Sequence, residues 1–343
     1  MNAYIYRIIN THYAVRLVLV AFLFALVAAV FAGCGEEPRK QSKAVVSDER
    51  IPLHLAYGKK IHYAPQIIAL KKGFFAAHKL DVEPKAVQAG IQAAEALTSG
   101  SADVAVMGDA PGIIAAASGM SIKIVASYGG GEKMHRLIAA ADSEIASPAD
   151  LRGKRVGVQM GSSTHGAFLL FLEKNGLATS DLTLVPLNPS DMPEAMLAGQ
   201  IDAGVGSEPW PSNIEERVQG SYEVATLSGL GNTYPLVLLV TEKLAEEHPD
   251  AIVAVLRATQ EAVDFMHERP GEAAVLISEA TGVPAERERK IMDTLDWQVV
   301  LDDATVKSLE QTADFLHSQA KITNLPDWKN VIDRSFIETF GSK

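Results

Sequence analysis

From Ile51 onward, apolar residues fall into short runs separated by segments in which they recur at helical spacing. The runs "LHLAY" (53–57) and "VAVM" (104–107) predict buried strands. The segments 65–72 and 93–99 between them predict helices. Regular alternation of the two patterns predicts an α/β fold in which helices cover a mainly parallel sheet.

Two glycine-rich segments, Tyr128–Lys133 and Leu227–Tyr234, interrupt this alternation and enclose a second set of predicted strands and helices. The chain is therefore expected to leave a first lobe, build a second and return, with two crossovers and a ligand cleft between the lobes. The expected boundaries are 51–130 with 233–343 for lobe 1 and 131–232 for lobe 2.

The first residues have the pattern of a processing signal. Arg7 and Arg16 precede "LVLVAFLFALVAAVFAGCG", an apolar run without charge, which predicts a signal peptide over 1–33. "FAGC" resembles the bacterial lipobox, with Phe31 where Leu is usual, and implies lipid attachment at Cys34 followed by a flexible tether over 34–50. The alternative is an uncleaved membrane anchor. Either way, the folded part is expected outside the cytoplasm.

Composition narrows the function classes. The 343-residue chain carries 31 basic and 42 acidic residues, a formal net charge of −11, and this acidic balance argues against a nucleic-acid binder. Cys34 is the only cysteine, so neither a disulfide framework nor a cysteine nucleophile or cysteine metal site is expected. His62, His135 and His165 are not accompanied by other histidines at metal-ligand spacing, so we expect no metal site and no cofactor.

The turn "GSSTHG" (161–166) joins a predicted strand to a predicted helix. Unpaired N–H groups at a helix N-terminus favour an anion or a polar ligand, and three hydroxyl side chains add donors. The alternative is that Ser162, Ser163 or Thr164 simply caps the helix, which is the commoner use of such residues.

Five stretches together resemble a known family: "HYAPQIIALKKGFFAAHKLDVEP", "AAEALTSGSADVAVMGDAP", "SPADLRGKRVGVQMGSSTH", "AMLAGQIDAGVGSEPW" and "LVLLVTEKLAEEHPDAIVAVLRA". The family is that of the periplasmic substrate-binding proteins of ABC transporters in the nitrate, sulfonate and taurine group, with relatives in the thiamine-precursor group. The resemblance implies a type II two-lobed fold that closes on a small molecule and presents it to a membrane permease. It also implies a monomer in the periplasm or on the outer face of the cytoplasmic membrane.

Carried over by position, the family's ligand loops fall on five segments of this chain. The candidate ligand-binding residues are Gly58, His62, Tyr63, Gly90, Gln92, Gly108, Asp109, Ser162, Ser163, Thr164, His165, Glu208 and Trp210. Gly90-Ile91-Gln92 departs from the small hydroxyl residues that the family often has there. Lys59, Lys60 and Arg136 are the candidate counter-ions for an anion. Asp109 has a capping alternative, and Trp210, between two prolines, has a packing alternative.

The ligand implied is a small organic anion such as a sulfonate, taurine or nitrate. The alternative ligand is a neutral or cationic heterocycle, such as a thiamine pyrimidine precursor or a flavin, stacked on Trp210 and Tyr63 and bonded to Asp109 or Glu208. An enzyme is not expected. The pyrimidine-synthesising relatives carry a cysteine cluster that this chain lacks, and "GSSTHG" fits neither a nucleophile elbow nor a phosphate loop.

Overall fold

Two five-stranded sheets organise the protein. The computed structural model describes residues 50–341, so the expected signal peptide, Cys34 and most of the tether lie outside the described residues. The first sheet has the order β2-β1-β3-β10-β4. Its strands are β1 (Ile51–Gly58), β2 (Leu80–Val87), β3 (Val104–Gly108), β4 (Ile122–Gly129) and β10 (Leu236–Thr241).

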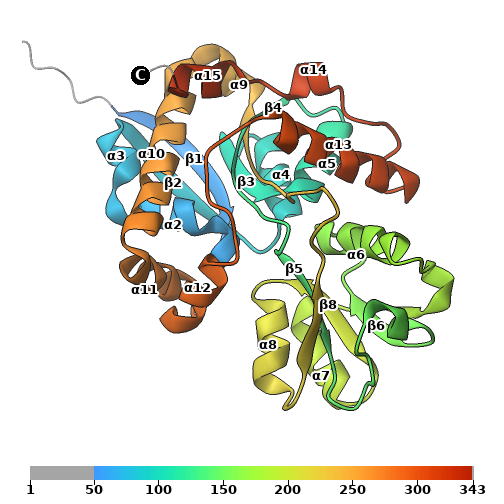
Figure 1. The fold of residues 1–343 in the computed structure, drawn as a ribbon. Coiled ribbons are helices and arrows are strands. Elements are labelled where there is room, and N and C mark those ends of the chain that lie inside the picture. Colours follow the sequence, from blue (N-terminus) through green and yellow to red (C-terminus); the bar gives the residue numbers. More distant parts are fainter. Residues whose placement is uncertain (1–49, 342–343) are drawn as a thin grey trace, which may run out of the picture. The chain divides into compact units, whose positions relative to one another are not determined.

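The second sheet is built from the chain between β4 and β10 and has the order β7-β6-β8-β5-β9. Its strands are β5 (His135–Ala139), β6 (Arg155–Val158), β7 (Thr183–Pro186), β8 (Ala203–Ser207) and β9 (Tyr222–Thr226). We call the first sheet with its helices lobe 1 and the second sheet with its helices lobe 2. Figure 1 shows the two sheets as separate parts of the described chain, with α6, α7 and α8 around the second.

Helices and short 3-10 turns connect the strands. In lobe 1 before the crossover they are η1 (Ile61–Tyr63), α2 (Ala64–Lys72), α3 (Phe74–Ala77), α4 (Gly90–Thr98) and α5 (Asp109–Ala117). In lobe 2 they are η2 (Pro148–Leu151), α6 (Ser163–Lys174), η3 (Thr179–Asp181), η4 (Pro189–Asp191), α7 (Met192–Leu197) and α8 (Trp210–Arg217). After β10 they are α9 (Glu242–Glu247), α10 (Pro249–Glu268), α11 (Pro270–Thr281), α12 (Ala285–Met292), α13 (Asp303–Ser318), α14 (Trp328–Val331) and α15 (Ser335–Gly341).

Each sheet is mainly parallel, as expected, but contains one reversed strand. β1 runs parallel to β2 and β3, but β10 runs antiparallel to β3 and β4. In the second sheet, β5 runs antiparallel to β8 and β9. The physical reason is the path of the chain. β5 and β10 each follow a crossover, so each enters its sheet from the end where the other strands leave it.

The two crossovers, residues 130–134 and 227–235, lie side by side. The N–H of Gly131 donates to the carbonyl oxygen of Thr233 at 2.6 Å, and the N–H of Gly130 donates to the carbonyl oxygen of Asp296 at 2.9 Å. Gly131 has φ +134°, a conformation that side chains disfavour. The glycines therefore allow two chain segments to pass each other at close range where the lobes join.

Buried aliphatic side chains hold helices to both sheets. On one face of the first sheet, Met107, Val237 and Leu239 pack with Leu309 and Leu316 of α13. α13 packs on α5 of lobe 1 and also contacts α6 of lobe 2, so a C-terminal helix touches both lobes. Among residues 50–341, no helix combines the length and the apolar composition needed to cross a bilayer.

Candidate functional site

Five buried side chains from both lobes and from the return crossover carry polar atoms that have no hydrogen-bond partner among the described residues. The atoms are Nε2 of His62, both amide atoms of Gln66, the hydroxyl of Tyr128, Nε2 of His135 and the hydroxyl of Tyr234. We call these five residues the polar cluster. Buried polar groups are nearly always hydrogen-bonded, because desolvating them without a partner costs free energy. A concentration of such groups therefore indicates a place where a polar ligand binds.

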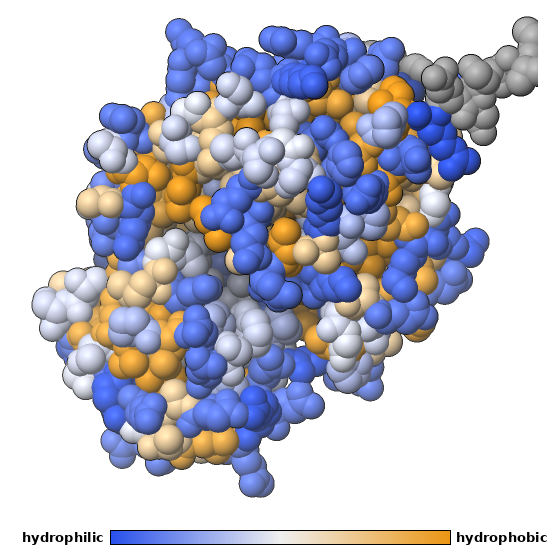
Figure 2. All heavy atoms as spheres, turned by 180° about the vertical axis from the view of Figure 1, so that it is seen from behind, coloured by the Kyte–Doolittle hydropathy of each residue, from blue (hydrophilic) through white to orange (hydrophobic). Residues whose placement is uncertain are grey.

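Four members of the polar cluster, His62, Tyr128, His135 and Tyr234, are linked to one another directly or through Tyr63. The rings of His135 and Tyr234 meet edge to face with centroids 4.5 Å apart. His62 contributes to the lowered pKa of His135, and the hydroxyl of Tyr63, next to His62, contributes to the raised pKa of Tyr128. His62 and Gln66 follow β1, Tyr128 ends β4, and His135 begins β5. The cluster is thus built where the strands of both sheets reach the junction between the lobes. Figure 2 shows a recess where the lobes meet.

Both histidines of the polar cluster are neutral near pH 7. Burial, and next the charge of Lys60, lowers the pKa of His62 to about 4. Burial, and next His62, lowers the pKa of His135 to about 3. Nδ1 of His135 lies 2.9 Å from the hydroxyl oxygen of Thr164. When that hydroxyl donates, Nε2 of His135 carries the proton and is a neutral donor for a ligand.

In the turn "GSSTHG", one hydroxyl caps the helix and two make contacts outside the turn. Ser162 is the N-cap of α6, and its hydroxyl accepts from the N–H of His165 at 3.2 Å. Ser163 and Thr164 instead make contacts outside the turn. Ser163 donates to the carboxylate of Asp109, and Thr164 bonds His135. His165 is buried, accepts from the N–H of Gly161 at 3.3 Å and packs edge to face on Phe315.

Asp109 is the first residue of α5, and Gly108 occupies its N-cap position. Its carboxylate is buried and accepts from Ser163 of lobe 2, from the hydroxyl of Thr312 of α13 at 2.8 Å and from the N–H of Ala110 at 2.7 Å. Burial raises the pKa of Asp109, and the hydrogen bonds oppose that rise. Asp109 therefore connects both lobes.

Of the candidate counter-ions, Lys59 and Lys60 form no ion pair among the described residues, and Lys60 is the less exposed of the two. No ion pair of Lys60 occurs among the residues described, and its ammonium lies 5.8 Å from the centroid of the Trp210 ring in lobe 2. Burial lowers the pKa of Lys60, and its charge acts on His62. Lys59 is exposed. A single ammonium thus lies beside the polar cluster and within reach of an aromatic ring from the other lobe.

Arg136 and Glu208 neutralise each other, which argues against two of the expected roles. The guanidinium of Arg136 bonds three carboxylates, those of Glu208 at 2.7 Å, Glu215 at 2.5 Å and Glu223. Glu208 is buried and also accepts from the hydroxyl of Ser212 at 2.7 Å. The Arg136 guanidinium therefore already has three carboxylate partners, and the carboxylate of Glu208 already accepts from Arg136 and Ser212.

Four residues of the first two expected loops, Gly58, Tyr63, Gly90 and Gln92, have mainly structural contacts. A Cβ at Gly58 would lie 2.4 Å from the Tyr63 ring, and one at Gly90 would lie 2.6 Å from the Pro111 ring. Burial raises the pKa of Tyr63 to about 12. Gln92 is exposed, and its side-chain oxygen accepts from the N–H of Gln88 at 2.8 Å, just before α4. The Gln92 side chain thus accepts from a backbone N–H just before its own helix and does not belong to the polar cluster.

Gln66, Tyr128, Tyr234 and Thr312 belong to this region but were not singled out from the sequence. Gln66 lies within an otherwise apolar helix, "APQIIAL", and that isolated polar residue on a buried face is the one signal available beforehand. Among the described residues, no group of three or more His, Cys, Asp or Glu side chains could hold a metal ion.

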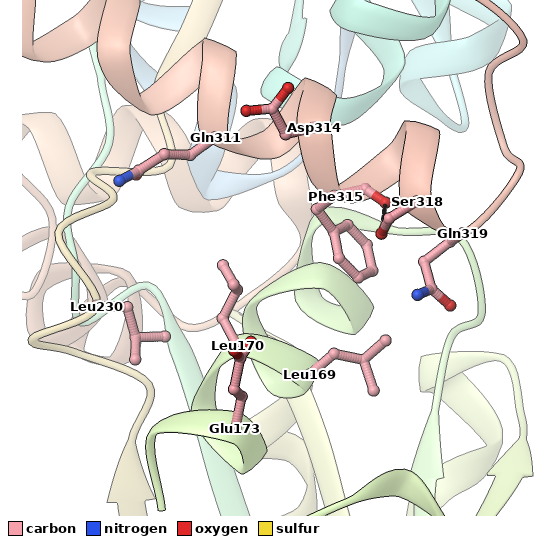
Figure 3. A pocket seen from close by; sticks show the side chains of 9 residues that line it. All are labelled: Leu169, Leu170, Glu173, Leu230, Gln311, Asp314, Phe315, Ser318 and Gln319. Atoms are coloured by element: carbon pink, nitrogen blue, oxygen red, sulfur yellow. Dashed lines mark hydrogen bonds between the residues drawn. The ribbon is translucent and has the colours of Figure 1, made fainter.

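A second hollow lies away from the polar cluster. It is a surface cavity of about 450 Å³ between α6 and α13, and none of the expected site residues lines it. Figure 3 shows Leu169 and Leu170 of α6 facing Phe315 of α13, with Gln311, Asp314 and Glu173 around the opening. This cavity therefore does not coincide with the expected site.

Comparison with known proteins places this geometry in a class. A family model described as NMT1/THI5 like matches residues 60–273. The chain is 29% identical over 323 residues to a putative aliphatic sulfonates-binding protein of Bacillus subtilis, covering 92% of this chain and 95% of that protein. The periplasmic aliphatic sulphonate binding protein SsuA from Escherichia coli matches with a TM-score of 0.77 at 25% identity, covering 82% of this chain and 92% of that one.

The fold is thus that of the two-lobed periplasmic binding proteins. The chain belongs to the NMT1/THI5-like family. The same fold also occurs in an enzyme, since the desulfurization enzyme DszB matches with a TM-score of 0.67 at 16% identity, covering 85% of this chain and 99% of that one. The two relatives named above are binding proteins.

Proposed function

We propose that this protein is an extracytoplasmic solute-binding lipoprotein that captures a small organic anion of the sulfonate class and delivers it to an ABC transporter permease. The observation that carries the proposal is the polar cluster. Buried polar groups without a partner come from both lobes, His62 and His135 among them lie close enough to act on each other, and the charge of Lys60 acts on His62. The names of the relatives, which refer to aliphatic sulfonates, support the same ligand class.

The donors suit an anion with one charge. Neutral imidazole, amide and phenol groups can donate to sulfonate oxygens without adding charge, and one lysine balances one negative charge. Trp210 offers an apolar ring to the organic part of the ligand. The heterocycle alternative has less support, because Glu208 is bonded to Arg136 and Ser212, and Asp109 already accepts three hydrogen bonds.

The remaining parts of the proposal rest on the N-terminal sequence. Cys34 is the proposed site of lipid attachment, which would place the monomeric binding protein at the outer face of the cytoplasmic membrane or in the periplasm. Binding and release then require no chemical step, so a bound sulfonate is expected to be recovered unchanged.

A ligand screen tests the proposal. Ethanesulfonate, taurine, nitrate and thiamine are added separately to the purified protein, and the change in its melting temperature is measured for each. Calorimetric titration then gives the affinity of each stabilising ligand. A ligand at a hundred times its dissociation constant stabilises the folded state by about 2.7 kcal/mol. Stabilisation by ethanesulfonate or taurine and not by thiamine supports the proposal, whereas the reverse result supports the heterocycle. Mass spectrometry of the recovered ligand detects any chemical conversion. A converted ligand would support an enzymatic function instead of a binding function.

A further inference from the structure

Arg287 joins the two lobes on the side of α12. It belongs to α12 of lobe 1, but the three hydrogen bonds of its guanidinium go to lobe 2. Its guanidinium donates to the carboxylate of Glu216 at 2.5 Å, to the amide oxygen of Asn213 at 2.5 Å and to the carbonyl oxygen of Pro209 at 3.1 Å. The Arg287 side chain is only 18% exposed. A charged side chain in this position is well placed to hold two elements together.

The helix that carries Arg287 is fixed within lobe 1. The neighbouring residue, Glu288, is buried and accepts from the hydroxyl of Thr281 at the end of α11, at 2.5 Å. α12 also packs on α11 and contacts η1, which carries His62 of the polar cluster. Arg287 therefore extends from an element that also supports the ligand site.

The acceptors in lobe 2 belong to the expected ligand loop and its helix. Pro209 directly precedes Trp210, whose ring lies beside Lys60 of lobe 1. α8, which carries Asn213 and Glu216, is itself tied to the second sheet through Glu215 and Arg136 of β5. A bond from Arg287 to this region therefore acts on lobe 2 as a whole.

We propose that Arg287 is a positioning residue that holds the Ser207–Trp210 loop and α8 of lobe 2 against lobe 1 in the closed form, and so sets the lifetime of the bound ligand. The part that concerns the ligand rests on the proposed function. The part that concerns closure rests on the hydrogen bonds alone and applies to the ligand-free protein.

The experiment uses the full chain with Cys34→Ser, which removes the native thiol. Spin labels are attached to two introduced cysteines, Glu95→Cys in α4 of lobe 1 and Gln200→Cys after α7 of lobe 2. Both labelled positions are exposed. Arg287→Met is compared with Arg289→Met. Arg289 lies two residues further along α12 and pairs only with Asp293 of lobe 1, which makes it a matched control. The label-to-label distance is measured without ligand, and the dissociation rate of ethanesulfonate is measured by stopped flow.

Arg287→Met is expected to add a population with a longer label-to-label distance and to speed ethanesulfonate dissociation about tenfold, because loss of a hydrogen-bonded charge acts mainly on the dissociation rate. Arg289→Met is expected to leave both unchanged. Equal distances and equal rates in the two variants would overturn the proposal. If ethanesulfonate does not bind the parent protein, the proposed function fails and the distances still decide the role in closure.

A second variant covers the case in which Arg287→Met does not fold. Asn213→Ala combined with Glu216→Gln removes the side-chain acceptors on α8 and leaves Arg287 and α12 unaltered. The same longer distance is expected, and an unchanged distance distribution in this folded variant would contradict the proposal.

Discussion

The hydroxyl of Ser163 donates a hydrogen bond to the carboxylate of Asp109, although the two residues are the first residues of helices in different lobes. The N–H of Ala110 also approaches the Ser163 oxygen, at 3.4 Å. The starts of α5 and α6 therefore face each other directly.

Substitutions at Ser163 and Ser162 distinguish the two roles considered for the "GSSTHG" turn, ligand binding and helix capping. Ser163→Ala removes a hydrogen bond to a charged group between the lobes, and such bonds contribute about 1.5–3 kcal/mol. Ethanesulfonate affinity is expected to fall about tenfold or more in calorimetric titration. Ser162→Ala is the control, since it removes the N-cap of α6 and is expected to cost about 1 kcal/mol of unfolding free energy with little change in affinity. Equal affinities in the two variants would exclude a ligand-related role for Ser163.

Lys60 is expected to supply the positive charge for the ligand. Lys60→Met should weaken ethanesulfonate binding about tenfold or more, because a charge-assisted hydrogen bond is lost. Lys59→Met is the matched control, because Lys59 is adjacent but exposed. Titration calorimetry at low salt measures both. Unchanged affinity in Lys60→Met would mean that neutral donors alone hold the anion.

The lowered pKa of His62 predicts acid sensitivity of the ligand-free protein. The folded state keeps His62 neutral down to about pH 4, whereas the unfolded chain takes up a proton below about pH 6.5. The contribution of His62 to the free energy of unfolding is therefore fully present above pH 6.5 and decreases as the pH falls toward 4. By pH 5 the loss is about 2 kcal/mol.

His62→Gln removes this contribution. Urea unfolding at pH 7 and pH 5 should show about 2 kcal/mol less acid destabilisation in the variant than in the parent. The parent and the variant share the opposite effect of Asp109, whose raised pKa favours the folded state on acidification, so it cancels in the comparison. Parallel pH dependence in the two proteins would refute the prediction.

Gly58 is expected to be required for the packing of Tyr63. A Cβ at this position would overlap the buried ring, so Gly58→Ala should lower the unfolding free energy by about 1–3 kcal/mol. Gly271→Ala is a suitable control, because nothing lies within 4 Å of its Cβ position. Urea denaturation compares the two, and an equally stable Gly58→Ala would show that Tyr63 moves freely.

Cys34 is expected to anchor the protein. Cys34→Ser should move the protein from the membrane fraction to the soluble fraction, because two or more acyl chains are needed for stable attachment. Cell fractionation with immunoblotting measures the change, and circular dichroism checks that the fold is retained. A variant that stays with the membrane after processing would contradict lipid attachment at Cys34.

The sequence predicts most strands and helices of this fold because apolar periodicity is local. It predicts the mainly parallel direction of the strands but not the reversal of β10 and β5, because these two strands owe their orientation to crossovers between lobes. The capping role of Ser162 is also local and is confirmed. The ion pairs of Arg136 are not local, because its three carboxylate partners lie 72, 79 and 87 residues further along the chain. Gln66 and Tyr128 were missed for the same reason, since only the folded chain shows that their polar atoms are buried together.

The position of the Trp210 ring beside Lys60 has a consequence for observing the protein. Only one of its three tryptophans, Trp210, lies in lobe 2, while Trp297 and Trp328 lie in the chain that follows β10. Tryptophan emission responds to a nearby charge, and the ammonium that acts on Trp210 belongs to the opposite lobe. Opening and closing should therefore change the emission of Trp210, which gives the native protein an intrinsic optical signal for the movement of its lobes.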